Sequence, residues 1–186
     1  MTTYQTIYAD PPWPYEDRKG PTGLRKEPWK HVGVEANYDT LPIAKIKALP
    51  VTNHVADNAH LYLWATNSFL VEAHEIARAW GFTPKTVLTW AKVKKTDGTP
   101  SMKTGYYYRG ASEHLLFAVR GRLRLAGPCR PTIYLLPREA HSVKPDRFYD
   151  LIEEQSPGPY LELFARRPRP GWSQWGNQIE STFQLQ

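Results

Sequence analysis

The sequence predicts an α/β fold in which a mostly parallel sheet is flanked by helices. Short apolar runs typical of buried strands alternate, in the first half of the chain, with segments that place apolar residues at helical spacing. Such alternation favours a parallel sheet, because each helix carries the chain back to begin the next strand in the same direction. The 186 residues are about enough for one domain. Residues 1–186 are therefore predicted to form a single unit.

The first predicted strand, residues 6–9, stops at an acid, two prolines and an aromatic residue. Proline cannot donate to a sheet ladder, and each proline restricts the residue before it to extended conformations. Asp10, Pro11, Pro12 and Trp13 are therefore expected to form a stiff corner beyond the strand. In this corner the Asp10 carboxylate and the Pro11 carbonyl are held as acceptors.

An acceptor-rich corner beside an aromatic ring suits methyl transfer to the exocyclic amine of a nucleobase. This amine is a poor nucleophile, because its lone pair is delocalised into the ring. Acceptors for its hydrogens localise the lone pair and compensate the charge that develops on nitrogen. Trp13 can stack on a base that has left its helix. A surface turn after a strand explains the same four residues equally well, so the rest of the chain must decide.

The following elements are predicted from patterns and caps. A short helix is expected with its N-cap at Thr40, Pro42 in its first turn and Pro50 as its stop. The segment 66–68 offers caps for a second helix, which Gly81 ends. Further strands are predicted at residues 60–65, 85–91, 114–119 and 160–165. In such sheets ligands bind beyond the carboxyl ends of the strands, where the corner at Asp10 lies.

A third helix is predicted through Phe148, Leu151 and Ile152, with Pro145 in its first turn. Lys144 just before this helix is locally unfavourable, because the start of a helix already carries positive partial charge. An anion shared between the helix amides and the ammonium explains the lysine, and the carboxylate of an amino-acid-bearing cofactor is one such anion. A solvent-exposed lysine without a ligand is the alternative.

Two predicted loops, residues 16–38 and 96–113, mix basic and aromatic side chains. Such loops can follow a nucleic-acid backbone and stack on its bases. The candidate contacts are Arg18, Lys19, Arg25, Lys26, Tyr107, Tyr108 and Arg109. A solvated loop explains the first segment equally well, and packing of the tyrosines on the core explains the second.

Composition narrows the class of protein. The net charge of +6 and the pI of about 9.4 favour a polyanionic partner, although charge alone decides little. Cys129 is the only cysteine, which excludes an intrachain disulfide and indicates a reducing compartment. One cysteine and six scattered histidines do not predict a metal site.

The sequence lacks a signal-peptide pattern and a membrane-spanning apolar run, so a cytoplasmic location without membrane association is expected. No Gly-x-Gly-x-x-Gly supports a dinucleotide or P-loop site.

Four motifs in order resemble the mRNA-type adenine-N6 methyltransferase family, which includes bacterial and phage DNA enzymes. They are Asp-Pro-Pro-Trp at 10–13, Lys-Pro-Asp at 144–146, Glu-Leu-Phe-Ala-Arg at 162–166 and Trp-Gly-Asn-Gln at 175–178. The resemblance extends from Ile7 to Gln178. It implies a Rossmann-like methyltransferase fold that uses S-adenosylmethionine. It also implies a circularly permuted order of motifs. In this order the catalytic motif at 10–13 precedes the strand at 160–165 that leads to the cofactor contacts.

The resemblance also implies roles for individual residues. By motif, Asp10, Pro11, Pro12 and Trp13 are catalytic, and Asp10 lies near the cofactor as well. Lys144 is implied to hold the methionine carboxylate. The implied ribose and adenosine contacts are Arg166, Arg169, Asn177 and Gln178.

We therefore expect methyl transfer from S-adenosylmethionine to the N6 amine of adenine in nucleic acid. DNA is preferred over RNA, because the compact form resembles the bacterial and phage members. The alternatives are an RNA adenine-N6 methyltransferase, a catalytically inactive nucleic-acid-binding partner subunit, and a small-molecule methyltransferase, which the basic loops disfavour. No accessory target-recognition domain is expected, so the grip on the substrate is expected to come from loops or from a second subunit, in a homodimer or with a partner.

Overall fold

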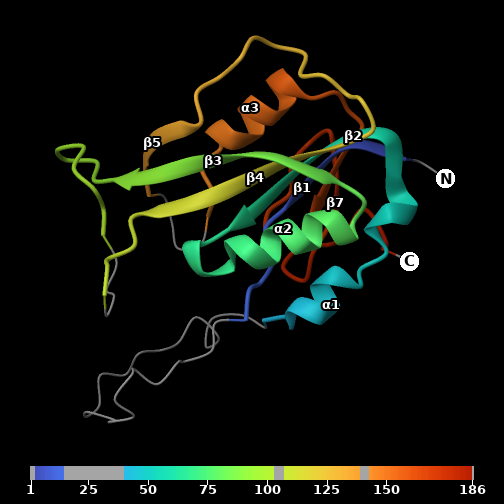
Figure 1. Ribbon diagram of the computed structural model, residues 1–186, viewed down its shortest axis with the longest axis horizontal. Coiled ribbons are helices and arrows are strands. Elements are labelled where there is room, and N and C mark those ends of the chain that lie inside the picture. The colour runs from blue at the N-terminus through green and yellow to red at the C-terminus, as the bar shows by residue number, and fades with distance from the viewer. Residues whose placement is uncertain (1–2, 15–39, 103–106, 139–142, 186) are drawn as a thin grey trace.

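The computed structural model describes residues 3–14, 40–102, 107–138 and 143–185. Their strands form a seven-stranded sheet in the order β5-β3-β4-β2-β1-β6-β7 (Figure 1). The strands are β1 Tyr4–Ala9, β2 Val55–Ala65, β3 Thr83–Val93, β4 Ser112–Arg120, β5 Ile133–Pro137, β6 Tyr160–Leu163 and β7 Trp172–Trp175. The α-helices are α1 Ile43–Lys47, α2 Leu70–Ala79 and α3 Arg147–Gln155, and the 3-10 helices are η2 Val51–His54 and η3 Asn67–Phe69.

The sheet is mostly parallel, as the sequence predicts. β1 lies between β2 and β6 and is parallel to both, and the pairs β3–β5 and β6–β7 are also parallel. β4 is the exception among the described strands, because it runs antiparallel to both of its neighbours, β2 and β3. β3 is therefore separated from β2 by β4, although α2 connects the two strands along the chain.

Helices cover both faces of the sheet, and Figure 1 shows α2 and α3 on opposite sides. Side chains alternate along a strand, so each strand supplies both layers of the core. Ile7 and Leu61 join the cluster that contains Ile76 of α2. Tyr8 and Trp64 join the second cluster, on the side of α3. No described helix has both the length and the apolar character needed to cross a membrane.

The carboxyl ends of the central strands meet at one edge of the sheet. Ala9 at the end of β1 pairs with Leu63 of β2 and with Leu163 of β6. Leu163 in turn pairs with Trp175 at the end of β7. Because β4 is antiparallel, its beginning lies at this edge, where His114 pairs with Ala65. Five chain segments that are distant in sequence therefore converge here, as expected for the ligand-binding edge of such a sheet.

The first two helices exist where the sequence predicts them, but their predicted caps are wrong. Pro42, and not Thr40, is the N-cap of α1, and no side chain caps that helix. α2 is likewise uncapped by a side chain, although residues 66–68 offered caps. Asn67 instead accepts hydrogen bonds from β4. The predicted end of α2 is confirmed, because Gly81 adopts a φ of +82° just beyond it.

In the last third of the chain, the observed helix and strand boundaries differ from the predicted ones. α3 begins at Arg147, so Pro145 lies before the helix and not in its first turn; its carbonyl accepts a hydrogen bond from the Phe148 amide. β6 ends at Leu163, two residues earlier than predicted, because Phe164 has a φ of +64°, which a strand does not accommodate. The segment predicted as a loop between Arg166 and Gln178 contains β7. The predicted loop 16–38 lies outside the described residues.

Candidate active site at the carboxyl edge of the sheet

Backbone hydrogen bonds fix the corner that follows β1. The Asp10 amide donates to the Leu163 carbonyl at 3.4 Å, so the corner starts from the neighbouring strand β6. The Trp13 amide donates to the Pro11 carbonyl at 2.9 Å, and the Leu41 amide donates to the Pro12 carbonyl at 2.9 Å. A carbonyl oxygen has two lone pairs, so Pro11 can accept a further hydrogen. Backbone hydrogen bonds therefore hold the predicted corner on both sides, and its stiffness stays a prediction.

Trp13 anchors this corner from inside. Its side chain is only 4% exposed, and its indole N–H donates to the Trp64 carbonyl at 3.1 Å. Its ring stacks on Phe69, with centroids 5.0 Å apart and planes 13° apart. In this arrangement the ring holds the corner against the turn after β2, and little of its surface faces outward. Stacking of Trp13 on a substrate base stays a prediction from the sequence.

Alternating charges surround Asp10. The Lys144 ammonium lies 2.7 Å from Asp10 Oδ2 and 3.3 Å from Glu113 Oε2. Arg166 Nη2 lies 3.6 Å from the same Asp10 oxygen. Glu113 Oε1 in addition forms an ion pair with Lys92 of β3. Lys92, Glu113, Lys144, Asp10 and Arg166 form a continuous ion-pair network, which we call the edge network.

The edge network holds Lys144 in its charged form. Burial by itself lowers the pKa of this ammonium, but Asp10 and then Glu113 oppose burial, and the net effect is a raised pKa. The side chain is 12% exposed, and its Nζ lies 5.3 Å from the centroid of the Trp64 ring. The alternative of a solvent-exposed lysine is therefore wrong. An ammonium has three donors, and the contacts with Asp10 and Glu113 account for two of them.

Asp10 presents its two oxygens differently. Both of its ion-pair contacts use Oδ2. Within the described part of the chain, Oδ1 makes no hydrogen bond, so its lone pairs can accept one from a ligand. A carboxylate that is held at one oxygen and open at the other can accept a hydrogen from a ligand without first rearranging.

A buried polar network supports the segment that carries the arginines. Glu162 of β6 is buried and accepts hydrogen bonds from the Tyr149 hydroxyl and from the Gln174 amide, both at 2.6 Å. Burial raises the pKa of Glu162, and these two hydrogen bonds oppose the rise. Gln174 also donates to the Arg167 carbonyl and accepts from the Arg169 amide. The turn between β6 and β7 is thus tied to the strands on both sides.

The structure separates the two arginines assigned to the ribose. Arg166 reaches Asp10, as described above. Arg169 instead lies against α3, where its guanidinium contacts Glu153 at 2.9 Å and Asp150 at 3.7 Å. The guanidinium carbon of Arg169 is 4.3 Å from the centroid of the Tyr149 ring. Of the two, only Arg166 is brought to the edge network.

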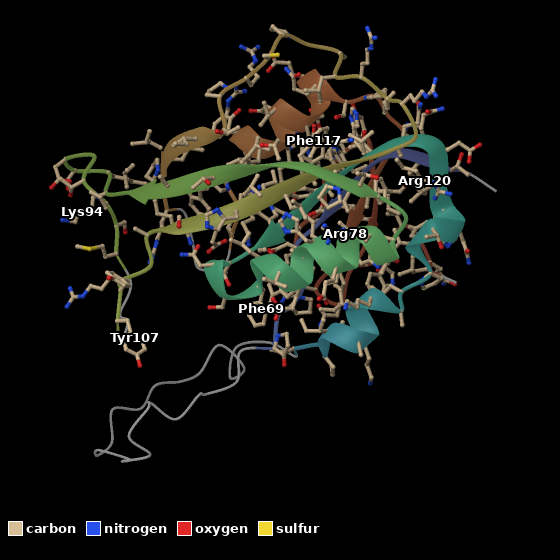
Figure 2. All side chains as sticks on the ribbon, in the orientation of Figure 1. Phe69, Arg78, Lys94, Tyr107, Phe117 and Arg120 are labelled. Atoms are coloured by element: carbon tan, nitrogen blue, oxygen red, sulfur yellow. The ribbon has the colours of Figure 1, made fainter. Side chains whose placement is uncertain are left out.

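The other residues that the sequence assigns to cofactor or nucleic-acid binding lie near strand ends, in the segments that follow them, or outside the described residues. Asn177 and Gln178 are exposed and directly follow β7, whose last residue pairs with the end of β6. Tyr107 and Tyr108 are 80% and 94% exposed, so the alternative that they pack on the core is wrong. Figure 2 shows Tyr107 pointing away from the sheet, in the segment between β3 and β4 that also carries the exposed Arg109. Arg18, Lys19, Arg25 and Lys26 lie outside the described residues.

A second polar group lies at the same edge, next to Glu113. His114 Nε2 donates to the Asn67 side-chain oxygen at 2.5 Å, and its Nδ1 lies 3.2 Å from the Thr89 hydroxyl. Burial lowers the pKa of His114, and the neighbouring Glu113 opposes this. The histidine therefore ties the turn after β2 to β3 and β4.

Sequence reasoning missed several of these residues, and some left a signal. Glu162 interrupts an otherwise apolar strand, which marks a buried polar group. Glu113 falls within the predicted loop 96–113, but β4 begins at Ser112 and carries it on a strand. Lys92 lies in the basic run of residues 92–95, and nothing in that run indicates that its side chain is buried. Only the pairing of β3 with β4 shows that these two charges meet.

The arrangement fits a ligand that carries a carboxylate and presents a hydrogen-bond donor. Lys144 and Arg166 supply positive charge beside Asp10, and Lys144 retains one donor for an anion. Asp10 Oδ1 and the Pro11 carbonyl are two acceptors in the same corner that a donor could use. In the described residues no group of three or more His, Cys, Asp or Glu side chains could hold a metal ion.

Comparison with known proteins agrees with these features. The sequence model of the MT-A70 family matches residues 4–178. The Type II methyltransferase M.MunI of Mycoplasma sp is 30% identical over 188 residues, which cover 95% of this chain and 78% of that protein. The N6-methyladenosine RNA methyltransferase MTA1 of Cryphonectria parasitica is 28% identical, with 95% and 52% covered. The N(6)-adenosine-methyltransferase catalytic subunit METTL3 of Homo sapiens is 26% identical, with 95% and 28% covered. The chain thus spans about half or less of these two eukaryotic relatives.

Proposed function

Because this chain belongs to the MT-A70 family, we propose that it transfers a methyl group from S-adenosylmethionine to the N6 amine of adenine in nucleic acid. The observation that supports the proposal most directly is the position of the Asp10 carboxylate and the contacts that it makes. This carboxylate lies beyond β1, an interior strand of the sheet, is held at Oδ2 by Lys144 and Arg166, and offers Oδ1 as an acceptor. The Pro11 carbonyl is the second acceptor in the same corner.

These acceptors address the weak nucleophilicity of the amine. Asp10 Oδ1 accepts one N6 hydrogen and the Pro11 carbonyl accepts the other, which localises the nitrogen lone pair. When bound, S-adenosylmethionine supplies the methyl group on a positively charged sulfur. Transfer of this group to the amine would leave the electrons of the old bond on the sulfur and place positive charge on the nitrogen. Asp10 compensates this charge, and the surplus proton leaves to water.

Cations at the edge are proposed to bind the cofactor. Lys144 donates to the methionine carboxylate through the hydrogen that is not engaged with Asp10 or Glu113, which is the kind of charge-assisted contact that fixes an anion. Arg166 faces the ribose, and the exposed amides of Asn177 and Gln178 the adenosine end. Arg169 is engaged by α3 acids, so a ribose contact through it requires that it leave them.

DNA is proposed ahead of RNA as the substrate. The chain covers 78% of the bacterial Type II methyltransferase but 52% of the relative named as an RNA methyltransferase. The protruding Tyr107 and Tyr108 supply two exposed rings for stacking. METTL3 is named as a catalytic subunit, which supports the view that a second subunit, or a second copy of this chain, completes the grip on the substrate. A cytoplasmic location stays a prediction.

A substrate panel tests the proposal. Labelled S-adenosylmethionine is incubated with the protein and unmethylated genome-length DNA, the same DNA after heat denaturation, and RNA transcribed from it. Digestion to nucleosides and mass spectrometry identify the methylated base. Label in N6-methyladenine is expected, with more in DNA than in RNA. Label in RNA alone favours the RNA enzyme, and label in no nucleic acid contradicts the proposal in favour of an inactive binding subunit.

A further inference from the structure

Lys92 is a buried cation whose position is fixed from several sides. Its side chain is 5% exposed, forms an ion pair with Glu113, and places its Nζ 4.5 Å from the centroid of the Trp90 ring. Its backbone is also held, because its amide donates to the Ala111 carbonyl and its carbonyl accepts from the Ser101 amide, both at 2.7 Å. Neither the strand nor the side chain has much freedom at this position.

Glu113 connects this cation to the proposed site. Its Oε1 contacts Lys92, and its Oε2 lies 3.3 Å from the Lys144 ammonium. Lys144 in turn lies 2.7 Å from Asp10. One carboxylate oxygen thus serves each lysine, and the orientation of the Glu113 carboxylate determines where Lys144 lies between its two acids.

Stability alone does not account for a lysine at this place. Removing an ammonium from water is costly, and a buried ion pair is often no more stabilising than apolar side chains of the same volume. A buried pair can instead select one arrangement among several. We propose that Lys92 is a positioning residue of the methyl-transfer site. It orients Glu113 so that Lys144 stays between Glu113 and Asp10, with its remaining donor directed to the cofactor carboxylate. The inference rests on the proposed function.

The consequence of losing Lys92 follows from the geometry. Without the lysine, Glu113 can turn both oxygens toward Lys144 and draw it away from Asp10. Displacements of about 1 Å in an active site can cost about 100-fold in rate. We expect Lys92→Met to lower the single-turnover methylation rate and the affinity for S-adenosylmethionine by about 10- to 100-fold, with little change in the nucleic-acid concentration required.

A double-mutant cycle tests whether Lys92 acts through Glu113. The proteins are the wild type, Lys92→Met, Glu113→Gln and the double variant, each measured for single-turnover methylation, for cofactor affinity by calorimetry and for thermal stability. Lys92→Gln replaces the methionine variant if that one does not fold. Lys47→Met is the matched control, because it removes a lysine from the ion pair with Glu75, in which the side chains are 35% and 48% exposed.

The expected result is strong coupling. Lys92→Met reduces rate and affinity in the wild type but has no further effect in the Glu113→Gln background, and Lys47→Met behaves as the wild type. Equal losses in both backgrounds, or no loss in either, overturn the inference. If the wild type methylates no nucleic acid, the proposed function fails. The calorimetric cycle then still decides the positioning role, because it requires only that the cofactor binds.

Discussion

Replacing Asp10 with asparagine removes one charge from the centre of the edge network while nearly preserving the shape of the side chain. The network contains three cations and two anions, so its net charge of +1 becomes +2 in the variant. Lys144 keeps Glu113 but loses its nearer partner at 2.7 Å, and Arg166 loses its contact at 3.6 Å. The new NH₂ group also places a donor in a corner where the target amine brings donors of its own.

Two magnitudes follow from these contacts. Loss of one preorganised hydrogen bond to the transition state typically lowers turnover by about 100- to 1,000-fold, so we expect a loss of at least this size. Stability should fall as well, because a charge-assisted hydrogen bond to a mostly buried ammonium contributes about 1.5–3 kcal/mol. Glu113 partly replaces Asp10 as the partner of Lys144, so the unfolding free energy should decrease by about 1–2 kcal/mol. From the sequence alone, a charge at a strand end would be expected to have no such effect.

The assay separates chemistry from binding and from folding. Single-turnover methylation at saturating cofactor and nucleic acid gives the rate, and urea denaturation gives the unfolding free energy. Asp57→Asn is the matched control, because Asp57 is exposed and lies toward the other end of β2. A rate near that of the wild type in Asp10→Asn would refute the assignment of Asp10 as acceptor for the target amine.

Three further predictions concern other parts of the molecule. Lys144→Met should weaken binding of S-adenosylmethionine by about 1.5–3 kcal/mol in calorimetry, the range for a charge-assisted hydrogen bond; unchanged affinity in a folded variant would remove Lys144 from the cofactor site. Replacing Tyr107 and Tyr108 together with alanine should raise the KM for nucleic acid, since each stacked base contributes about 1–3 kcal/mol, and leave cofactor affinity unchanged. Normal methylation by this variant at limiting substrate would show that the two rings make no such contact. Stability should decrease as the pH falls below 6.5, because burial lowers the pKa of His60 and the unfolded chain binds the proton first. The loss is at most about 1.4 kcal/mol per pH unit for one group, and His60→Gln should reduce the slope; equal slopes in denaturation curves measured from pH 7.5 to 5.5 would contradict this.

Much of the fold follows from local patterns in the sequence. The apolar runs that end at Ala9 and Ala65 are strands because they are buried on both faces, and period and composition reveal this directly. Gly81 ends α2 because it adopts a positive φ without strain. The helix caps failed for a tertiary reason. Asn67 has the right chemistry for a cap, but it instead accepts hydrogen bonds from Ser112 and His114, and nothing local reveals that β4 brings these donors to it.

Only the site residues that belong to recognisable motifs could be predicted from the sequence. Asp10 and Lys144 belong to recognisable motifs, and the structure brings their charges within 2.7 Å of each other. Glu113 and Lys92 belong to no such motif, and their meeting depends on the antiparallel pairing of β3 with β4, in which Ala91 pairs with Ser112. Arg169 has the right residue type in the right segment. The acids of α3 nevertheless hold it, and their proximity is a property of packing rather than of spacing along the chain.

The pairing of β1 with β6 places the Asp-Pro-Pro-Trp motif beside the end of β6, although this strand comes much later in the chain. The two strands are separated by about 150 residues, yet Ala9 pairs with Leu163 and the Asp10 amide donates to the Leu163 carbonyl. A ligand at the end of β6 therefore lies beside Asp10 whichever strand comes first. This arrangement in turn requires one particular register between β1 and β6. A slip of one residue between β1 and β6 would turn Asp10 to the opposite face and move it by about 3.3 Å along the strand. The contact of Asp10 with Arg166, at 3.6 Å, would then be lost. The site thus depends on the pairing of the two strands and not on either motif alone.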